Sequence, residues 1–262
     1  MDELPKPVGS FLPNIKTEER PASCEKHGDY ISKGFSLGRR INWIGCPDCE
    51  RERIEQVEAE SASRRADEAQ KRMEYKLNRV GIPLRYRGKD FASFQAETDA
   101  QERARAVAME FAQNFDQHAA KGTVAIFSGL PGTGKSHLAI AIAQAVMQTK
   151  SVFYTSAIDA VRMVRDTWRK GSEKTELEVL DMFASIDLLI LDEVGVQYGT
   201  DAEQITLFDI IDKRYRDMKP TILLTNQNKA GMKEFLGDRS FDRLREGGIW
   251  VTFDWKSQRG SQ

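Results

Sequence analysis

The fold of this chain is decided by the stretch Phe127-Ser128-Gly129-Leu130-Pro131-Gly132-Thr133-Gly134-Lys135-Ser136. From Gly129 onward it matches the phosphate-binding pattern G-x-x-x-x-G-K-S at every fixed position. An apolar run at 123–128 predicts a strand before it, and an alanine-rich run at 137–148 predicts a helix after it. The alternative is an ordinary glycine turn, which does not account for the fixed positions together with these flanks. The stretch therefore predicts a nucleotide site.

The glycines, the lysine and the serine of this stretch have separate parts in holding a nucleotide. Glycine tolerates positive φ, so the backbone can wrap closely round an anion. The amides at the start of the following helix point toward the phosphates. Lys135 would bridge the β- and γ-phosphates, and the hydroxyl of Ser136 would bind Mg²⁺. The predicted nucleotide-binding residues are Gly129, Pro131, Gly132, Thr133, Gly134, Lys135, Ser136 and His137.

Two acids extend the nucleotide site. An aliphatic run at 186–191 ends in Asp192 and Glu193, and it predicts a buried parallel strand. Ligands of open α/β sheets bind beyond the carboxyl ends of the strands, so both acids should lie beside the phosphate loop. Asp192 would bind Mg²⁺, directly or through water, and Glu193 would polarise a water for attack on the γ-phosphate. The alternative is a strand that ends in a solvated acidic turn.

Another strand-like run, at 220–226, ends in Thr225 and Asn226. The amide of Asn226 would reach the γ-phosphate or the attacking water. The alternative is that the pair only opens a turn.

The sequence from 89 to 262 alternates strands with helices. Predicted strands lie at 123–128, 151–155, 187–192, 221–225 and 248–253. Predicted helices lie at 101–118, 135–148, 157–169, 173–184 and 202–218, with short helices across 229–244. Apolar strands separated by helices predict an α/β fold in which a five-stranded parallel sheet is covered on both faces.

Composition agrees with such a domain plus a smaller appendage. The chain has 262 residues, a net charge of −1, 40% hydrophobic and 30% charged residues. No apolar run is long enough to span a membrane, and residues 1–23 lack the apolar core of a secretory signal. We therefore expect a cytoplasmic protein without a membrane partner, and any basic surface must be local.

A metal site is predicted near the N-terminus. Cys24-x-x-His27 and Cys46-x-x-Cys49 are separated by eighteen residues and contain all three cysteines of the chain. Thiolate and imidazole ligands in a set of four favour tetrahedral Zn²⁺, and with no open position the site would be structural. The alternatives are a disulfide or unliganded side chains. An odd number of cysteines argues against the disulfide.

Three regions follow from these patterns. Residues 1–50 would form the zinc-binding module, and 89–262 the nucleotide-binding domain. Between them, 51–88 would be a charged helix and linker, because dense charges of both signs leave few large apolar residues there. This helix would be either a solvated spacer or a lever that joins the module to the domain.

Several segments together resemble one family of ATPases. They are Leu-Leu-Ile-Leu-Asp-Glu-Val-Gly-Val-Gln at 188–197, Leu-Leu-Thr-Asn at 223–226, Leu-Gly-Asp-Arg-Ser-Phe-Asp-Arg-Leu-Arg at 236–245, Phe-Asp-Trp-Lys-Ser at 253–257 and Gly-Ile-Pro-Leu-Arg-Tyr at 81–86. With the phosphate loop, they resemble the AAA+ ATPases of the DnaC/DnaI type, the replicative-helicase loaders of bacteria and phages. The likeness covers about 75–259 and implies a AAA+ P-loop NTPase fold. The short stretch after the last predicted strand suits the loader type.

The resemblance implies further roles. ATP would be hydrolysed with Mg²⁺, and Arg243 matches an arginine finger that reaches a neighbouring subunit's ATP. Arg239 is the substitute candidate, and Arg259 matches an arginine that senses the γ-phosphate in its own subunit. Each arginine is otherwise a solvated charge. A finger acting between subunits implies self-association, and relatives use the stretch that includes Pro83, Arg85 and Tyr86 near the adenine.

A loader must also engage a replicative hexameric DNA helicase and single-stranded DNA. Arg162, Arg165, Trp168 and Arg169 would supply cations for phosphates and a ring for bases. The helical spacing of the arginines predicts that they share one face. The alternative is a tryptophan packed on the sheet beneath a solvated charged face.

The resulting hypothesis is an ATP-dependent DNA replication protein that loads the replicative helicase onto single-stranded DNA. Two alternatives remain. One is an IstB-like ATPase that regulates transposition through duplex DNA and a transposase. The other is an adaptor that keeps its nucleotide bound and tethers partners through the zinc module.

Overall fold

The structure, a computed structural model, describes residues 17–37, 40–195 and 201–258. The chain divides into two compact units, residues 1–72 and 73–262, and each is described by itself. Among the described helices, none has the length and apolar character needed to cross a bilayer.

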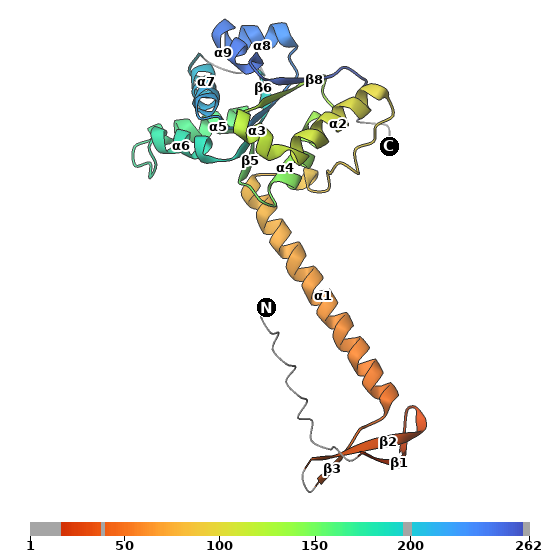
Figure 1. Cartoon of the computed structure of the whole chain (residues 1–262). Coiled ribbons are helices and arrows are strands. Elements are labelled where there is room, and N and C mark those ends of the chain that lie inside the picture. The colour runs from red at the N-terminus through yellow and green to blue at the C-terminus, as the bar shows by residue number, and fades with distance from the viewer. Residues whose placement is uncertain (1–16, 38–39, 196–200, 259–262) are drawn as a thin grey trace, which may run out of the picture. The chain divides into compact units, whose positions relative to one another are not determined.

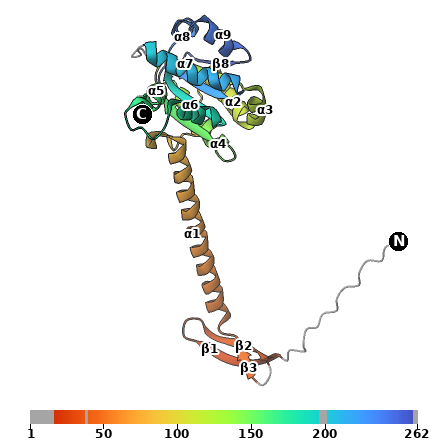
Figure 2. The ribbon, with the colours of Figure 1, turned by 90° about the vertical axis from the view of Figure 1, so that its left-hand side faces the viewer.

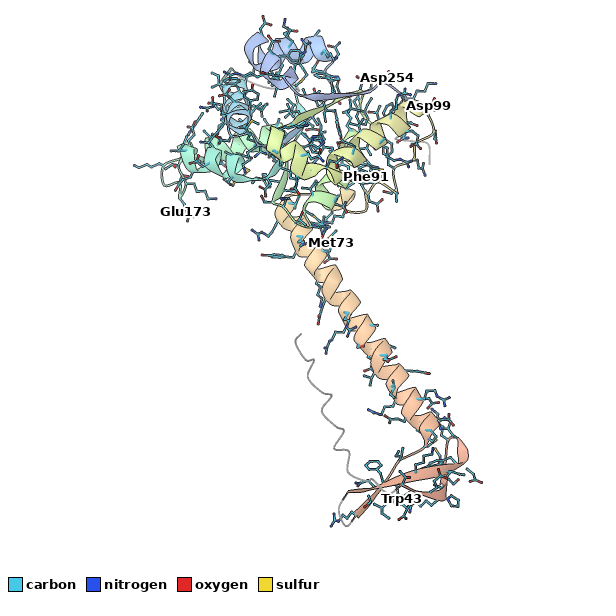
Figure 3. All side chains as sticks on the ribbon, viewed as in Figure 1. Trp43, Met73, Phe91, Asp99, Glu173 and Asp254 are labelled. Atoms are coloured by element: carbon cyan, nitrogen blue, oxygen red, sulfur yellow. The ribbon has the colours of Figure 1, made fainter. Side chains whose placement is uncertain are left out.

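The first unit contains a small antiparallel sheet in the order β1-β2-β3, visible in Figures 1 and 2. Its strands are β1 (Thr17–Cys24), β2 (Gly28–Leu37) and β3 (Arg40–Trp43). The tryptophan that ends β3, labelled in Figure 3, lies under the guanidinium of Arg20 at 4.2 Å. Gly28 opens β2 with a φ of +79°, which lets the chain turn tightly after Cys24.

Helix α1 (Pro47–Val80) contains the charged helix predicted from the sequence. Its exposed surface carries ion pairs one turn apart, such as Arg51 with Asp48 at 3.0 Å. The residues from Met73 onward belong to the second unit, where Leu77 and Val80 are buried in the core.

The second unit is built on the predicted five-stranded parallel sheet, in the order β5-β6-β7-β4-β8. The strands are β4 (Val124–Gly129), β5 (Val152–Ser156), β6 (Leu188–Val194), β7 (Thr221–Thr225) and β8 (Ile249–Phe253). The α-helices are α2 (Asp99–Gln113), α3 (Phe115–Lys121), α4 (Lys135–Val146), α5 (Ala157–Arg165), α6 (Glu176–Ser185), α7 (Asp201–Arg216), α8 (Lys229–Leu236) and α9 (Asp238–Arg245). Short 3₁₀ turns occur at Leu84–Tyr86 and Asp166–Trp168.

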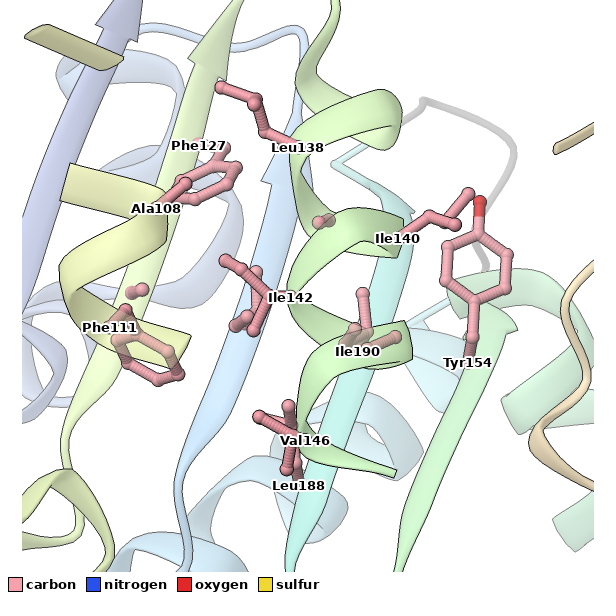
Figure 4. Packing of buried hydrophobic residues seen from close by; sticks show 14 of the residues in the cluster. Ala108, Phe111, Phe127, Leu138, Ile140, Ile142, Val146, Tyr154, Leu188 and Ile190 are labelled. Atoms are coloured by element: carbon pink, nitrogen blue, oxygen red, sulfur yellow. The ribbon is translucent and has the colours of Figure 1, made fainter. Parts of the chain in front are cut away.

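Two apolar cores hold the helices to the two faces of this sheet. On one face lie α4, α2, α3 and the end of α1. Figure 4 shows Leu138, Ile142 and Val146 of α4 projecting toward the strands, with Phe111 of α2 beside them. Helices α5 to α9 cover the other face. The sheet is therefore buried on both sides, as its uninterrupted aliphatic strands predict.

Arg214 of α7 is fully buried at the end of the sheet where β6 and β7 begin. Its guanidinium donates to three carbonyl oxygens, those of Phe183, Ile186 and Pro220, and to the hydroxyl of Thr221. Burial lowers the pKa of Arg214 to about 9. The carbonyls satisfy a charge that would otherwise be very costly to bury.

Two predicted helices are interrupted in the structure. The helix predicted at 101–118 is divided at Asn114 into α2 and α3. Helix α5 ends at Arg165, and Arg169 follows the next 3₁₀ turn with an extended backbone. The prediction that Arg169 shares a helix face with Arg162 and Arg165 is therefore wrong, because the helix has already ended.

Candidate functional site

The phosphate loop lies between β4 and α4, as the sequence predicts. Gly134 precedes the helix with a φ of +96°, and a Cβ there would lie 2.6 Å from the ring of Phe94. A Cβ on Gly129 would lie 2.1 Å from the carbonyl oxygen of Phe253. Only glycine fits either position without moving its neighbours.

Lys135 is buried at the start of α4, and its ammonium group lies within the loop. Its Nζ donates to the carbonyl oxygens of Gly129 at 2.6 Å and Leu130 at 2.8 Å. Thr133 braces the same loop by donating its hydroxyl to Leu130 O at 2.8 Å. The cation is thus held against the backbone of the loop at the start of α4, which is where phosphate oxygens would bind.

A cleft opens beside this loop and brings most of the predicted nucleotide residues together. Its lining residues are Tyr86, Lys89, Pro131, Gly132, Gly134, Lys135, Ser136, His137, Asp192, Glu193, Asn226 and Gln258. The cleft has a volume of about 270 Å³, slightly below the usual range of ligand clefts, about 300–1,000 Å³. Tyr86 from the segment before the domain is in this lining, whereas Pro83 and Arg85 are not.

Asp192 lies at the end of β6 and accepts three hydrogen bonds. Oδ2 accepts from the Ser136 hydroxyl at 2.9 Å and from the phenol of Tyr154, and Oδ1 accepts from the amide of Glu193 at 2.8 Å. Burial, followed by the nearby charge of Asp192, raises the pKa of Tyr154, so the phenol stays protonated as a donor. The hydroxyl and the carboxylate together offer the oxygen ligands that Mg²⁺ prefers.

Glu193 reaches the cleft because β6 contains an extra residue. Leu191 pairs with Leu223 and Val194 with Thr225, so two residues of β6 oppose one residue of β7. Glu193 has a φ of +61°, a backbone conformation that is uncommon for a side chain of this kind. In a regular strand, consecutive acids would point to opposite faces. The bulge lets both acids line one cleft.

Asn226 follows β7, the strand between β6 and β4, and lines the cleft. Hydrogen bonds behind it join three strand ends. Ser128 donates to Gln227 O at 2.6 Å, Thr225 donates to Val194 O at 2.7 Å, and Gln227 Nε2 donates to Gly195 O at 3.1 Å. These bonds fix the backbone that carries Asn226.

His137 and the segment before α2 form another wall. The Nε2 of His137 lies 2.8 Å from Asp90 O and 3.2 Å from Ser93 Oγ, and its ring meets Phe94 edge-on at 5.3 Å. Burial lowers the pKa of His137. The neutral ring can donate one hydrogen bond, which we assign to the carbonyl of Asp90.

The predicted arginine candidates are placed differently from one another. Arg243 on α9 forms an ion pair with Asp212 of α7, and its guanidinium lies 5.8 Å from the centre of the Tyr215 ring. It does not line the cleft of its own chain. The side chain of Arg239 and the whole of Arg259 lie outside the described residues, as does the end of the 188–197 motif.

The predicted DNA-binding residues lie on α5 and the turn that follows it. Arg162 pairs with Asp159 at 2.9 Å, and Arg169 pairs with Asp166 at 3.0 Å. Trp168 is 55% exposed and donates from Nε1 to Glu176 at 2.7 Å. The alternative of a tryptophan packed on the sheet is therefore wrong. Arg165 is also exposed, so the segment presents cations and an accessible ring.

In the first unit, the four predicted zinc ligands converge. One ligand atom from each of Cys24, His27, Cys46 and Cys49 lies within 4.8 Å of the others. The three sulfur atoms lie 3.8, 3.6 and 3.3 Å from Nδ1 of His27, in that chain order, and Cys24 Sγ lies 3.5 Å from Cys49 Sγ. Tetrahedral zinc requires about 3.6 Å between nitrogen and sulfur and about 3.8 Å between sulfurs. The three cysteines are free thiols, which excludes the disulfide alternative in this structure.

The surroundings of the cluster suit a metal. The backbone amides of Lys26 and His27 lower the pKa of the Cys24 thiol, which favours the thiolate that a metal binds, whereas the hydrogen bond with Cys24 raises the pKa of Cys49. The other ring nitrogen of His27, Nε2, lies 3.1 Å from Glu52, and Lys26 donates to the same carboxylate. A carboxylate on the distal nitrogen fixes which nitrogen faces the metal.

Four residues around these sites escaped the sequence analysis. Tyr154, Lys89, Gln258 and Glu52 come from segments far from the motifs or lack a motif of their own. Tyr154 and Lys89 have no sequence signal, because any aromatic or long side chain would fit their local patterns. For Glu52, the spacing of three residues from Cys49 on a predicted helix was a usable signal.

Comparison with known proteins agrees with this geometry. A family model described as IstB-like ATP binding protein matches residues 50–244. The replicative helicase loader DnaC of Escherichia coli (strain K12) is 35% identical over 207 residues, covering 78% of this chain and 83% of the loader.

Solved structures show the same fold. A crystal structure of the DnaC helicase loader superposes with a TM-score of 0.59 at 24% identity, covering 65% of this chain and 99% of that one. The replication initiator DnaA bound to AMPPCP and single-stranded DNA gives 0.55 at 28% identity, covering 67% of this chain and 51% of that one.

The fold and the phosphate loop thus define an ATP-binding protein of the AAA+ P-loop class, and the predicted fold is confirmed. The chain belongs to the family of IstB-like ATP binding proteins, and the helicase loader DnaC is a homologue. The resemblance expected from the sequence is therefore confirmed.

Proposed function

We propose that this chain is an ATP-hydrolysing loader that binds a replicative DNA helicase and places it on single-stranded DNA. The observation that carries the proposal is the identity of 35% to the loader DnaC over most of both chains, together with a cleft in which Lys135, Asp192 and Glu193 converge. A chain that only stored a nucleotide would have no need of a second acid aimed into the cleft.

The residues of the cleft suit water attack on a γ-phosphate. Lys135 and the loop amides would hold the phosphates, and Mg²⁺ bound by Ser136 and Asp192 would neutralise charge on them. Glu193, freed from the strand register by the bulge, would orient the attacking water. Asn226 would contact the water or the γ-phosphate from the neighbouring strand.

The zinc module would be the partner-binding end. Zn²⁺ held by Cys24, His27, Cys46 and Cys49 would supply folding free energy to a unit that has little apolar core. Ser32 and Cys46 are buried there, whereas Ile31 is 63% exposed. A module of this kind would present a rigid surface to the helicase.

Single-stranded DNA would bind along α5 and the turn after it. Trp168 offers a ring for stacking, and Arg162, Arg165 and Arg169 offer cations for phosphates. Substituting Trp168 and Arg165 by Ala is expected to weaken binding of labelled single-stranded DNA, by about 1–3 kcal/mol for the stacked base alone. Unchanged affinity would remove this segment from the proposal.

Loading itself can be tested with purified components. The chain is mixed with a hexameric replicative helicase, ATP, Mg²⁺ and circular single-stranded DNA, and helicase retained on the DNA is measured. We expect retention to depend on the chain and on ATP. A chain that forms no complex with the helicase under these conditions would contradict the proposal.

The Glu193→Gln variant separates binding from turnover. We expect its ATP affinity to stay within about threefold of the parent, while hydrolysis falls by roughly 10²–10⁴-fold, the usual contribution of a positioned base. Normal turnover in this variant would remove Glu193 from the mechanism.

A second candidate is a regulator of transposition, favoured by the IstB-like description of the family model. Such a protein would bind duplex DNA and a transposase. Parallel capture with immobilised helicase and immobilised transposase distinguishes the two, because only one partner is expected to be retained. A nucleotide-switched adaptor, the remaining alternative, would show no sustained hydrolysis with helicase and single-stranded DNA.

A further inference from the structure

The segment after β8, the edge strand next to β4, contacts the phosphate loop. This post-β8 segment (residues 254–258) begins at Asp254, which is labelled in Figure 3. Trp255 Nε1 donates to the carbonyl oxygen of Thr133 at 2.9 Å. The backbone amide of Gln258 donates to the carbonyl oxygen of Gly132 at 3.0 Å. Two consecutive carbonyls of the loop are therefore held by one segment.

Holding a carbonyl also orients an amide. In a trans peptide, the C=O and the N–H of the same planar unit point in opposite directions, and the described residues contain no cis peptide. Fixing the oxygen of Gly132 fixes the N–H of Thr133, and fixing the oxygen of Thr133 fixes the N–H of Gly134. Within the described chain, neither amide donates to another group. Both are available to an anion.

The post-β8 segment is itself anchored in the core. The ring of Trp255 packs 4.9 Å from Phe253, which packs 5.4 Å from Phe127 of β4. Phe253 is fully buried, and its carbonyl oxygen lies so close to Gly129 that no side chain fits there. This packing fixes the position of the Trp255 indole N–H relative to the loop.

A second contact ties the segment to the other flank of the loop. Gln258 Nε2 donates to the carbonyl of Gln95 at 3.0 Å, next to Phe94, whose ring fills the space beside Gly134. Gln258 also lines the cleft. The loop is therefore supported from two sides by residues that are 163 positions apart in the sequence.

We propose that the post-β8 segment preorganises the phosphate loop, with Trp255 and Gln258 as positioning residues for the β- and γ-phosphates of the nucleotide. The inference rests on the proposed nucleotide site and deepens it. Because amides that are already oriented need no reordering, anion binding costs less. The segment should therefore affect affinity for the phosphates and should not affect recognition of the nucleoside.

The test uses variants of the full chain that remove one donor each. Trp255→Phe deletes the indole N–H and keeps an aromatic ring, and Trp250→Phe is the matched control on β8, outside the cleft. Gln258→Pro deletes the backbone N–H, whereas Gln258→Ala keeps it. Dissociation constants for ATP, ADP and AMP with Mg²⁺ are measured by competition with a fluorescent ATP analogue, alongside the melting temperature.

We expect Trp255→Phe and Gln258→Pro each to weaken the binding of ATP and of ADP by about fivefold, the effect of one lost hydrogen bond. Affinity for AMP should change by less than twofold, since AMP lacks the phosphates that the loop holds. Gln258→Ala should weaken ATP less than Gln258→Pro, and Trp250→Phe should match the parent.

Three outcomes overturn the inference. One is unchanged ADP affinity in both donor-deleting variants. Another is an equal loss for AMP and ADP, which would indicate a general disturbance of the fold. The last is a parent chain that binds no nucleotide, which would remove the proposed nucleotide site as well and so is distinguishable from failure of the inference alone.

Discussion

At the scale of single residues, the site depends on how one carboxylate is held. Asp192 receives donors from α4, β5 and its own strand, through Ser136, Tyr154 and the amide of Glu193. Such partners orient a metal ligand and remove its freedom to turn away. The phenol of Tyr154 keeps its proton because burial raises its pKa.

Removing that phenol should weaken the magnesium site. In Tyr154→Phe, Asp192 loses a donor, so we expect the Mg²⁺ concentration for half-maximal ATP binding to rise by about tenfold. Titration of Mg²⁺ at fixed ATP analogue gives this value. Tyr75→Phe, at an exposed tyrosine of α1, is the control. Equal Mg²⁺ dependence in parent and Tyr154→Phe would show that the phenol does not orient the acid.

The acidic limit of stability should depend on His137. Burial puts the folded pKa of His137 below the unfolded value, which is about 6.5. The contribution of His137 to the free energy of unfolding is therefore complete above the unfolded pKa. It is lost as the pH falls below that pKa, because unfolding then takes up a proton. Lys89 strengthens this shift and Asp90 opposes it.

We expect the melting temperature of the parent to fall more steeply between pH 7.5 and 5.5 than that of His137→Gln. The comparison is made within the transition of the ATP-binding unit at each pH. Parallel curves for the two proteins would contradict the assignment of a neutral, buried His137.

Motif residues were predictable and their supports were not. The motif spacing around Lys135 and the apolar strand before Asp192 predict directly where these two side chains lie. A strand–loop–helix order fixes which side chains meet. Tyr154 and Trp255 act through geometry that only the folded chain supplies. Arg243 was predictable as a motif position, but its ion pair with Asp212 was not.

At the scale of elements, the sequence predicts the apolar strands best. The five strands of the parallel sheet were predicted because buried strands read as continuous aliphatic runs. Strand β1 was missed because Thr17–Cys24 is polar and largely exposed, with no alternation of apolar residues. A small sheet beside a metal cluster needs no such pattern, since ligand bonds replace much of the apolar core.

Glu52 should tighten zinc binding through His27. In Glu52→Gln, the distal nitrogen of the imidazole loses its charged acceptor, and we expect zinc affinity to fall by about 10–100-fold. Competition with a coloured chelator measures the change. Glu55→Gln, an exposed neighbour on α1, is the control. Equal zinc retention in both variants would mean that Glu52 only pairs with Lys26 at the surface.

At the scale of the whole molecule, the proposed arginine finger would act on the nucleotide of a second chain. Arg243 does not reach the cleft of its own subunit, so an arginine finger would have to act on a neighbour. Asp212 would have to release Arg243, or share it, when subunits assemble. The ion pair would therefore hold the Arg243 side chain against Asp212 of α7 until a phosphate competes for it.

Mixing two inactive variants tests this arrangement. Lys135→Ala removes the loop cation and Arg243→Ala removes the finger, so each alone should lose about 10³-fold or more in hydrolysis. An equal mixture should recover about a quarter of the parent rate, because one interface in four then joins an intact loop to an intact finger. The control variant is Arg216→Ala, which changes the other arginine paired with Asp212. It should hydrolyse ATP at the parent rate. A mixture that stays inactive would rule out action between subunits.

The bulge in β6 constrains how this protein can diverge. Substituting Glu193 alters one reactive group and leaves the backbone path intact. Deleting Glu193 would also remove the bulge, and Val194 would then keep its pairing with Thr225 and its place in the core, two positions after Leu191. Random libraries should therefore yield folded, inert proteins both by exchange and by loss of this residue, because either change removes the reactive group and keeps Val194 in its core.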